Sequence, residues 1–244
     1  MNQSVIKKLT PALQKAIGNE IPNLIDSRFL IGDNQKYMKM YDWMSKGYDF
    51  AESIIGKLKY GNSIKEMRTE IMSKLDWRND CSVLYISIGT GNDLQFIPKK
   101  INIKSLNFIG ADISIGMLRK CKKKFENKMN LSLIQCCAES LPFQDNTFDI
   151  VFHVGGINFF NDKSLAIQEM IRVAKPNNKI LIADETNDYI EKQYKKSTLS
   201  KKYFIDKKFD FTDIINAIPI EVKDIETTML WNNKFYCITF KKTK

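Results

Sequence analysis

The stretch VLYISIGTGNDL, residues 83–94, decides the fold of this chain. It starts as an apolar run and ends in two glycines, Gly89 and Gly91, that flank Thr90. Glycine tolerates positive φ and lets another group approach the main chain where a Cβ would collide. The pattern therefore predicts a buried strand that ends in a sharp turn facing a ligand. A G-x-G pair alone is a weak signal, because a purely structural turn uses the same residues.

The segments that follow predict the rest of a sheet. Further apolar runs alternate with segments of helical period, and they read LNFIGADI, LSLIQCC, FDIVFHVGG and KILIADE. Continuous hydrophobicity of this kind is typical of parallel strands that are covered on both faces. After residue 218, two strand-like runs flank the pair NN and predict an antiparallel hairpin. We therefore predict an α/β fold with a Rossmann-like open sheet of about seven strands, mostly parallel, with helices on both faces.

The chain is predicted to form one domain. Residues 1–78 show helical periodicity and are predicted to form an N-terminal helical cap on a core that spans residues 79–244. An aromatic and lysine-rich segment at about 187–217 interrupts the core and is predicted to act as a lid over a site.

Composition limits the classes of function. The 244 residues are 43% hydrophobic, which is enough for one full core. No apolar stretch reaches the roughly 18 residues of a membrane span, and no signal-peptide pattern is seen, so a cytoplasmic protein is expected. The five cysteines form no C-x-x-C pair, so neither a metal site nor a disulfide framework is predicted. Only five of the 38 basic residues are arginine, which disfavours nucleic acid as the partner of a chain with net charge +10.

A second signal comes from the acidic residue at the end of the next apolar run. Asp112 follows Gly89 by 23 residues, close to the offset of roughly 20 at which a carboxylate binds ribose hydroxyls in nucleotide-binding folds. Its alternative role is an N-cap, for which Ser114 is better placed. Leu94 stands where a dinucleotide site needs a small residue, and Asp93 would repel a pyrophosphate. These residues predict a ligand that has an adenosyl group but no phosphate.

Four segments in this order resemble the class I S-adenosylmethionine-dependent methyltransferases, specifically the type 11 group that includes ubiquinone/menaquinone-biosynthesis enzymes. The segments are VLYISIGTGNDL, IGADISIGMLRKCKKK, CCAESLPFQDNTFDIVF and EMIRVAKPNNKILIADE. The resemblance implies S-adenosyl-L-methionine as cofactor and S-adenosyl-L-homocysteine as product. It implies cofactor contacts from Tyr41, Tyr48, Ser87, Gly89, Thr90, Gly91, Asp93, Asp112, Ile113, Met117, Cys137, Ala138, Glu139 and His153.

The chain also departs from the pattern of this family. Tyr85 stands where the family usually has an acidic residue, and Ser87 replaces the first glycine of its G-x-G-x-G. Cys137 replaces the aspartate that bonds the exocyclic amine of adenine in many members. Tyr41 and Tyr48 have a second interpretation as packing residues of the helical cap.

The implied reaction is an in-line methyl transfer to an O, N or C atom of a small molecule. Alignment and desolvation supply roughly 7–11 kcal/mol in well-oriented reactions, so a base is optional. His153, the single histidine, is the candidate catalytic base, with simple packing as its alternative role. The candidate substrate contacts are Gly156, Phe159, Phe160, Tyr203 and Phe204.

The basic, aromatic lid predicts an anionic or amphiphilic acceptor and peripheral contact with an anionic membrane. Two other functions stay open at this point: RNA methylation, and cofactor binding without catalysis.

Overall fold

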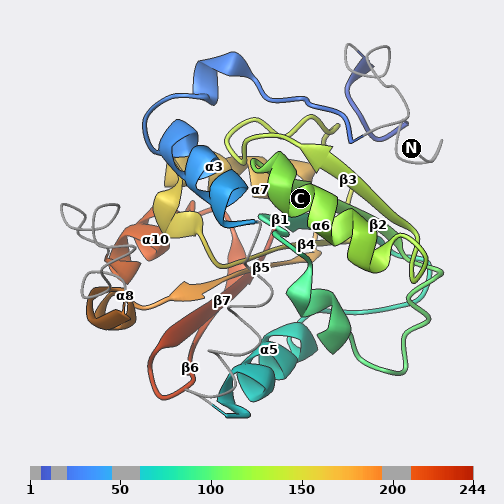
Figure 1. Cartoon of the computed structure of the whole chain (residues 1–244). Coiled ribbons are helices and arrows are strands. Elements are labelled where there is room, and N and C mark those ends of the chain that lie inside the picture. Colours follow the sequence, from blue (N-terminus) through green and yellow to red (C-terminus); the bar gives the residue numbers. More distant parts are fainter. Residues whose placement is uncertain (1–6, 12–20, 46–60, 194–209, 244) are drawn as a thin grey trace.

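The computed structural model describes residues 7–11, 21–45, 61–193 and 210–243. Its strands form a seven-stranded sheet of order β3-β2-β1-β4-β5-β7-β6 (Figure 1). The strands are β1 (Ser82–Ile86), β2 (Asn107–Asp112), β3 (Leu131–Gln135), β4 (Ile150–Val154), β5 (Lys179–Glu185), β6 (Lys223–Leu230) and β7 (Phe235–Lys241). Strands β1 to β5 pair in parallel, and β7 pairs antiparallel with both β5 and β6. The predicted fold class is confirmed.

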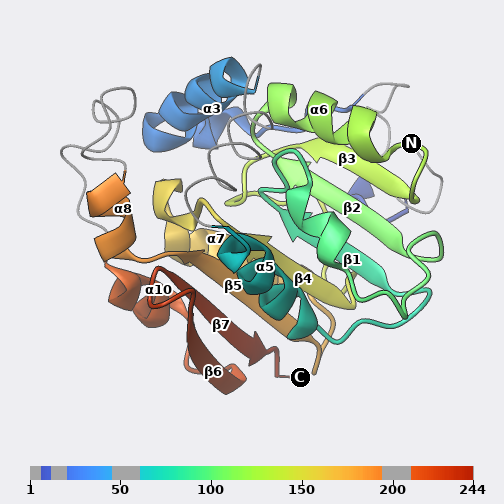
Figure 2. The ribbon, with the colours of Figure 1, turned by 60° about the horizontal axis from the view of Figure 1, so that its bottom comes forward.

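Helices cover both faces of the sheet (Figures 1 and 2). The described helices are η1 (Ser27–Phe29), α3 (Gly32–Met44), α5 (Ser63–Ser73), η2 (Asn92–Phe96), α6 (Ile115–Phe125), η3 (Ile157–Phe159), α7 (Lys163–Val173), α8 (Asn187–Gln193) and α10 (Phe211–Ala217). Buried residues of α5 and α6 share one hydrophobic cluster, whereas those of α7 and α10 share the other.

The two clusters follow from the alternation of side chains along each strand. On β1, Val83 and Tyr85 belong to the cluster on the α5 and α6 side, and Leu84 and Ile86 belong to the opposite cluster. All five residues of β1 are buried, which is why its sequence is apolar without alternation.

The crossover after β1 differs from a usual βαβ unit. The turn leads into η2, a five-residue 3-10 helix, instead of an α-helix. Ile97 directly after it is extended, with φ −54° and ψ 131°. Pro98 explains this conformation, because a proline disfavours the α region for the residue before it.

The C-terminal hairpin joins β6 to β7 as predicted, through a turn in which Asn232 and Asn233 adopt φ of 52° and 61°. Within the predicted lid, the structure describes α8 and α10, while residues 194–209 lie outside the described ranges. Tyr48, Tyr203 and Phe204 also lie outside them, so their contacts stay predictions.

Helices α3 and α5 from the predicted N-terminal cap occupy different places. Helix α3 contacts α6 and η3, beside the carboxyl ends of the strands, as Figure 1 shows. Met67, Ile71 and Met72 of α5 pack into a face of the sheet. Helix α5 therefore belongs to the layer that also contains α6.

Candidate functional site

A cavity of about 870 Å³ lies at the carboxyl ends of β1, β2, β4 and β5. Strand order reverses between β1 and β4, and ligands of open α/β sheets bind at such a switch point. The volume lies within the range of small-molecule sites. Of the residues predicted from the sequence, the cavity wall contains Tyr41, Ser87, Gly89, Thr90, Asp93, Asp112, Ile113, Met117, Ala138, Glu139, Gly156, Phe159 and Phe160.

The two glycines of the opening stretch have different surroundings. Gly89 has φ of +55°, and a Cβ built on it would meet nothing within 4 Å. A Cβ on Gly91 would lie 2.8 Å from Cys121 Sγ and 2.9 Å from Phe125 Cε2, both on α6. Gly91 is absent from the described cavity wall. The turn thus packs closely against α6 at Gly91, and the predicted cofactor contact of its main chain stays a prediction.

Asp112 is held at the end of β2 by main-chain donors. Its Oδ2 accepts from Gly89 N–H at 2.8 Å, and its Oδ1 accepts from Ser114 N–H at 2.8 Å. Ser114 is the N-cap of α6, because its Oγ accepts from Met117 N–H at 3.2 Å. The Asp112 carboxylate thus has no capping role and faces the cavity.

Burial raises the pKa of Asp112 to about 6, although its N–H donors oppose this shift. The Asp42 carboxylate on α3 acts in the same direction as burial. Asp42 accepts from Ser114 Oγ at 2.5 Å and from Gly116 N–H at 2.9 Å. These bonds join α3 to the start of α6. Asp42 was not among the residues predicted from the sequence.

A charged cluster lies beside the glycine turn. The buried Asp93 carboxylate accepts from the Tyr85 hydroxyl at 2.5 Å and forms an ion pair with Arg68 of α5. All three side chains line the cavity. The resemblance led us to expect an acidic residue on the strand, at position 85. The acidic residue of this region is instead Asp93 in the turn, which is hydrogen-bonded to Tyr85. Arg68 was not predicted, since nothing in the sequence links it to a residue 25 positions later.

At the end of β3, the cavity wall is built by the segment that begins at Cys136. Cys136, Ala138 and Glu139 line the cavity, but Cys137 does not. Burial raises the pKa of the Cys137 thiol to about 12, so it stays protonated. The Cys137 side chain thus lies outside the cavity wall that its neighbours form, and the predicted cofactor contact at this position stays a prediction.

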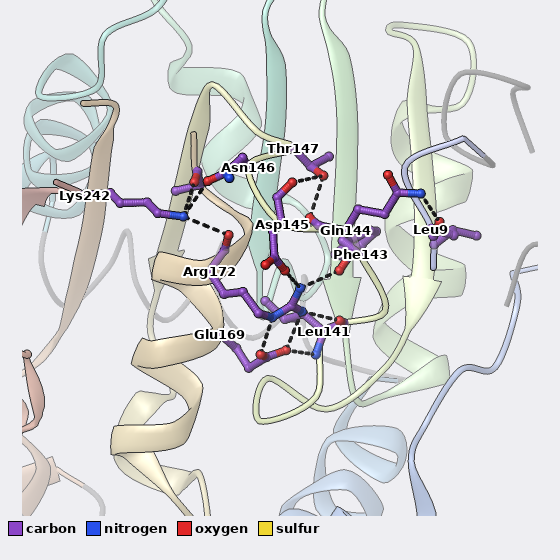
Figure 3. A network of polar contacts seen from close by, with 11 residues as sticks. Leu9, Leu141, Phe143, Gln144, Asp145, Asn146, Thr147, Glu169, Arg172 and Lys242 are labelled. Carbon is purple, nitrogen blue, oxygen red and sulfur yellow. Dashed lines mark hydrogen bonds and ion pairs between the residues drawn. The ribbon is translucent and has the colours of Figure 1, made fainter. Parts of the chain in front are cut away.

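The loop after this segment is fixed by Arg172 of α7 (Figure 3). Its guanidinium donates to the carbonyl oxygens of Phe143 and Leu141 at 2.7 and 2.9 Å, and it pairs with Glu169 at 2.6 Å. Glu169 Oε2 in turn accepts from Leu141 N–H at 2.8 Å. This network anchors the loop that follows Glu139, including Leu141 of the cavity wall.

His153 does not reach the cavity. It pairs with Ile182 across β4 and β5, and it lies two residues from Val151, so it faces the α7 side of the sheet. The ring is fully buried, and neither ring nitrogen has a hydrogen-bond partner among the described residues. Burial lowers the pKa of His153 to about 3. The predictions that His153 acts as a base and binds cofactor are corrected, and its packing alternative agrees with its position.

Asp184, at the carboxyl end of β5, is a further carboxylate of the cavity wall. Its Oδ2 accepts from Gly156 N–H at 3.1 Å and from Asn158 Nδ2 at 3.2 Å. Burial raises the pKa of Asp184 to about 6. The sequence offered a signal for it, because Asp184 ends an apolar run in the same way as Asp112.

Aromatic side chains form part of the cavity wall. The rings of Tyr37 and Phe159 lie 4.5 Å apart between centroids, and those of Tyr189 and Trp231 lie 5.1 Å apart. All four line the cavity. This end of the cavity is suited to a flat apolar ligand.

Within residues 7–11, 21–45, 61–193 and 210–243, no group of three or more His, Cys, Asp or Glu side chains is placed to hold a metal ion. Among the same residues, no helix has both the length and the apolar character needed to cross a bilayer.

Comparison with known proteins relates this site to a family. The family model described as "Methyltransferase domain" matches residues 83–177. The chain is 30% identical over 158 residues to a demethylmenaquinone methyltransferase of Shouchella clausii, covering 64% of this chain and 65% of that protein. It is 25% identical over 154 residues to a ubiquinone/menaquinone biosynthesis C-methyltransferase of Geotalea daltonii, covering 62% and 63%. The match thus spans less than two thirds of the length of these relatives.

A solved structure shares the fold. Phosphoethanolamine N-methyltransferase 2 of Haemonchus contortus, in complex with S-adenosyl-L-methionine, has a TM-score of 0.67 at 15% identity. The match covers 88% of this chain and 61% of that one.

Proposed function

Because this chain belongs to the class I S-adenosylmethionine-dependent methyltransferases, we propose that it transfers a methyl group from S-adenosyl-L-methionine to a small-molecule acceptor. The observation that carries the proposal is the order of polar groups along the ends of neighbouring strands. Arg68 and Asp93 lie beside β1, Asp112 ends β2, and Glu139 follows β3.

The cofactor fits this order part by part. A methionine group has a carboxylate and an ammonium group, which match Arg68 and Asp93 in charge. The ribose presents two hydroxyls, and a carboxylate such as Asp112 can accept from both. Adenine would then lie toward β3, between the side chains of Ile113 and Met117 and the segment that holds Glu139.

When bound, the cofactor supplies an electrophilic methyl group on a sulfonium. The chain contributes orientation and the exclusion of water. Val154, Phe159 and Tyr37 give the cavity apolar walls beside the carboxyl end of β4. Holding two reactants in line within such walls supplies roughly 7–11 kcal/mol, so the proposal requires no dedicated base.

We propose an amphiphilic acceptor with a flat ring. The aromatic wall supports this class, and the two curated relatives are named for methylation in quinone biosynthesis. An anionic acceptor has less support, because the charged residues of the described wall are five acids and one base. These are Asp93, Asp112, Glu139, Asp184, Glu185 and Arg68.

The test has two steps. Calorimetry should detect binding of S-adenosyl-L-methionine and S-adenosyl-L-homocysteine, with much weaker binding of NADH. The chain should then transfer labelled methyl to a member of a panel of quinols, phenols and amines, with release of S-adenosyl-L-homocysteine. Tight NADH binding without binding of S-adenosyl-L-methionine would contradict the proposal.

A further inference from the structure

Strand β6 forms one edge of the described sheet, in which β7 is its single neighbour. Asp224 adopts φ of 55° beside a bulge against β7, so the regular part of β6 begins at Ile225. From there to Met229 the side chains are exposed, except for that of Thr228, which is half-buried. The outer edge of such a strand offers a row of unpaired N–H and C=O groups, which is a template for another strand.

This stretch has few of the residues that usually protect a sheet edge. Edge strands are commonly protected by lysine, proline or inward-pointing charges, whereas residues 225–229 read IETTM and have one charge. Ile225 and Met229 are 50% and 44% exposed. Together with Ile220, they are three of the five large hydrophobic residues that are exposed in the described part of the chain. Exposed apolar residues thus concentrate at this edge.

The two faces of β6 differ in character. Thr228 lies on the α5 side, because its Oγ1 accepts from Nζ of Lys74, the C-cap of α5, at 3.2 Å. Alternation along the strand places Glu226 on the same face as Thr228. Ile225 and Met229 take the opposite face. One face of the edge is therefore polar and charged, and the other is apolar.

We propose that two copies of this chain associate through antiparallel pairing of their β6 strands, about a two-fold axis at Thr227. Closed two-fold dimers are the commonest assemblies of soluble chains. Such an axis is perpendicular to the sheet, so facing side chains come from the same face of β6. Ile225 then faces Met229 of the second copy, and Met229 faces Ile225 of the second copy. Both exposed apolar side chains gain a cross-strand contact.

Charge complementarity selects this position of the axis. Glu226 faces Thr228 of the second copy, next to the ammonium group of Lys74 of that copy. Neither Glu226 nor Lys74 has an ion pair among the described residues, so the dimer gives each a partner of opposite charge. An axis at Glu226 would set two glutamates against each other, and one at Thr228 would set Glu226 against the apolar Leu230.

Sedimentation velocity of the full chain, from low micromolar to several hundred micromolar, tests for the dimer. The wild-type chain should dimerise with a Kd in the micromolar range, since a single strand pair gives a small interface. Glu226→Lys should weaken dimerisation roughly 2- to 30-fold, because it changes two cross-strand pairs and sets ammonium groups side by side. Glu126→Lys is the matched control, because it makes the same charge change at the exposed end of α6, which contacts β2 and β3. It should leave dimerisation unchanged, and melting curves check that each variant is folded.

A cross-link tests the position of the axis. All five cysteines of the chain are buried, so Thr227→Cys introduces one exposed thiol, which the axis brings against the same thiol of the second copy. A short bismaleimide should therefore convert Thr227→Cys to a covalent dimer. Asn127→Cys, exposed after α6, is the control and should stay monomeric.

Each outcome supports or overturns the inference. A monomer at every concentration overturns it, as does a dimer that Glu226→Lys leaves unchanged. Equal cross-linking of Thr227→Cys and Asn127→Cys overturns the axis at Thr227. None of these measurements uses the cofactor, so the inference can fail while the proposed function holds, and the reverse.

Discussion

Replacing Arg68 by methionine should weaken binding of S-adenosyl-L-homocysteine but leave binding of 5′-methylthioadenosine nearly unchanged. The two ligands share adenosine and a thioether, and only the first has an amino-acid group. Arg68 pairs with Asp93 at the cavity wall beside the glycine turn, where the proposed site places the methionine carboxylate. A loss that depends on the amino-acid group is thus the signature of direct contact.

The expected losses of ligand affinity and of unfolding free energy in Arg68→Met follow from the burial of the Arg68–Asp93 pair. The side chains of Arg68 and Asp93 are 18% and 5% exposed, so their ion pair is largely shielded from water. A hydrogen bond to a charged group contributes about 1.5–3 kcal/mol, which is a loss of roughly 10- to 150-fold in affinity for S-adenosyl-L-homocysteine. Unfolding free energy should also fall by about 3 kcal/mol, the low end for breaking a buried pair, because the Tyr85 hydroxyl still donates to Asp93. In a chain of this size that lowers Tm by roughly 6–12 °C.

The assay is calorimetric titration of both ligands well below the Tm of the variant. Arg68→Lys is the matched control: it keeps the charge but not the planar fork, and should fall between the wild-type chain and Arg68→Met. Equal losses for both ligands, or lower Tm with unchanged affinities, would refute the reasoning. The pair would then only join α5 to η2.

The other predictions concern Asp112, His153 and the two glycines of the turn. Affinity for S-adenosyl-L-homocysteine should fall as pH drops through about 6, because ribose hydroxyls donate to ionised Asp112, and calorimetry of Asp112→Asn should show no such dependence. Asp112 has the opposite effect on the stability of the unliganded chain: because its folded pKa is raised, its contribution to the unfolding free energy, taken as the difference between the wild-type chain and Asp112→Asn, should decline as pH rises from about 4 to about 6. Because burial lowers the pKa of His153 to about 3, the unfolding free energy of the wild-type chain relative to that of His153→Leu should fall as pH drops below about 6.5, and the variant should keep methyl transfer. In denaturant titrations, Gly91→Ala should cost more than about 2 kcal/mol because of the Cys121 contact, whereas Gly89→Ala should cost about 1 kcal/mol and mainly reduce cofactor affinity.

The fold was predictable because its signals are local and repeated. Each parallel strand is buried on both faces, so the apolar runs stand out without knowledge of their partners. The hairpin was visible in the same way from its Asn232–Asn233 turn. The 3-10 crossover was missed, although Pro98 gave a local reason to expect a short helix.

The place of the cavity was predictable where one residue at a strand end marks its wall, as for Gly89 and Asp112. The residues of the cavity wall were not predictable where they depend on which face of a strand, or which side of a loop, a side chain occupies. In a strand whose residues are all buried, nothing in the sequence tells which face His153 takes. Gly91 and Cys137 depend in the same way on where α6 and the core lie.

The departures from the family pattern are linked through contacts between distant residues. A second carboxylate at position 85 would lie beside Asp93, and like charges at that distance oppose ionisation of both. Tyr85 instead donates to Asp93 at 2.5 Å, and its ring stacks on Phe152 with centroids 4.2 Å apart. A tyrosine on the strand and an acid in the turn therefore suit each other. Asp93 is then the carboxylate beside Tyr85 in the cavity wall, and Arg68 forms an ion pair with it.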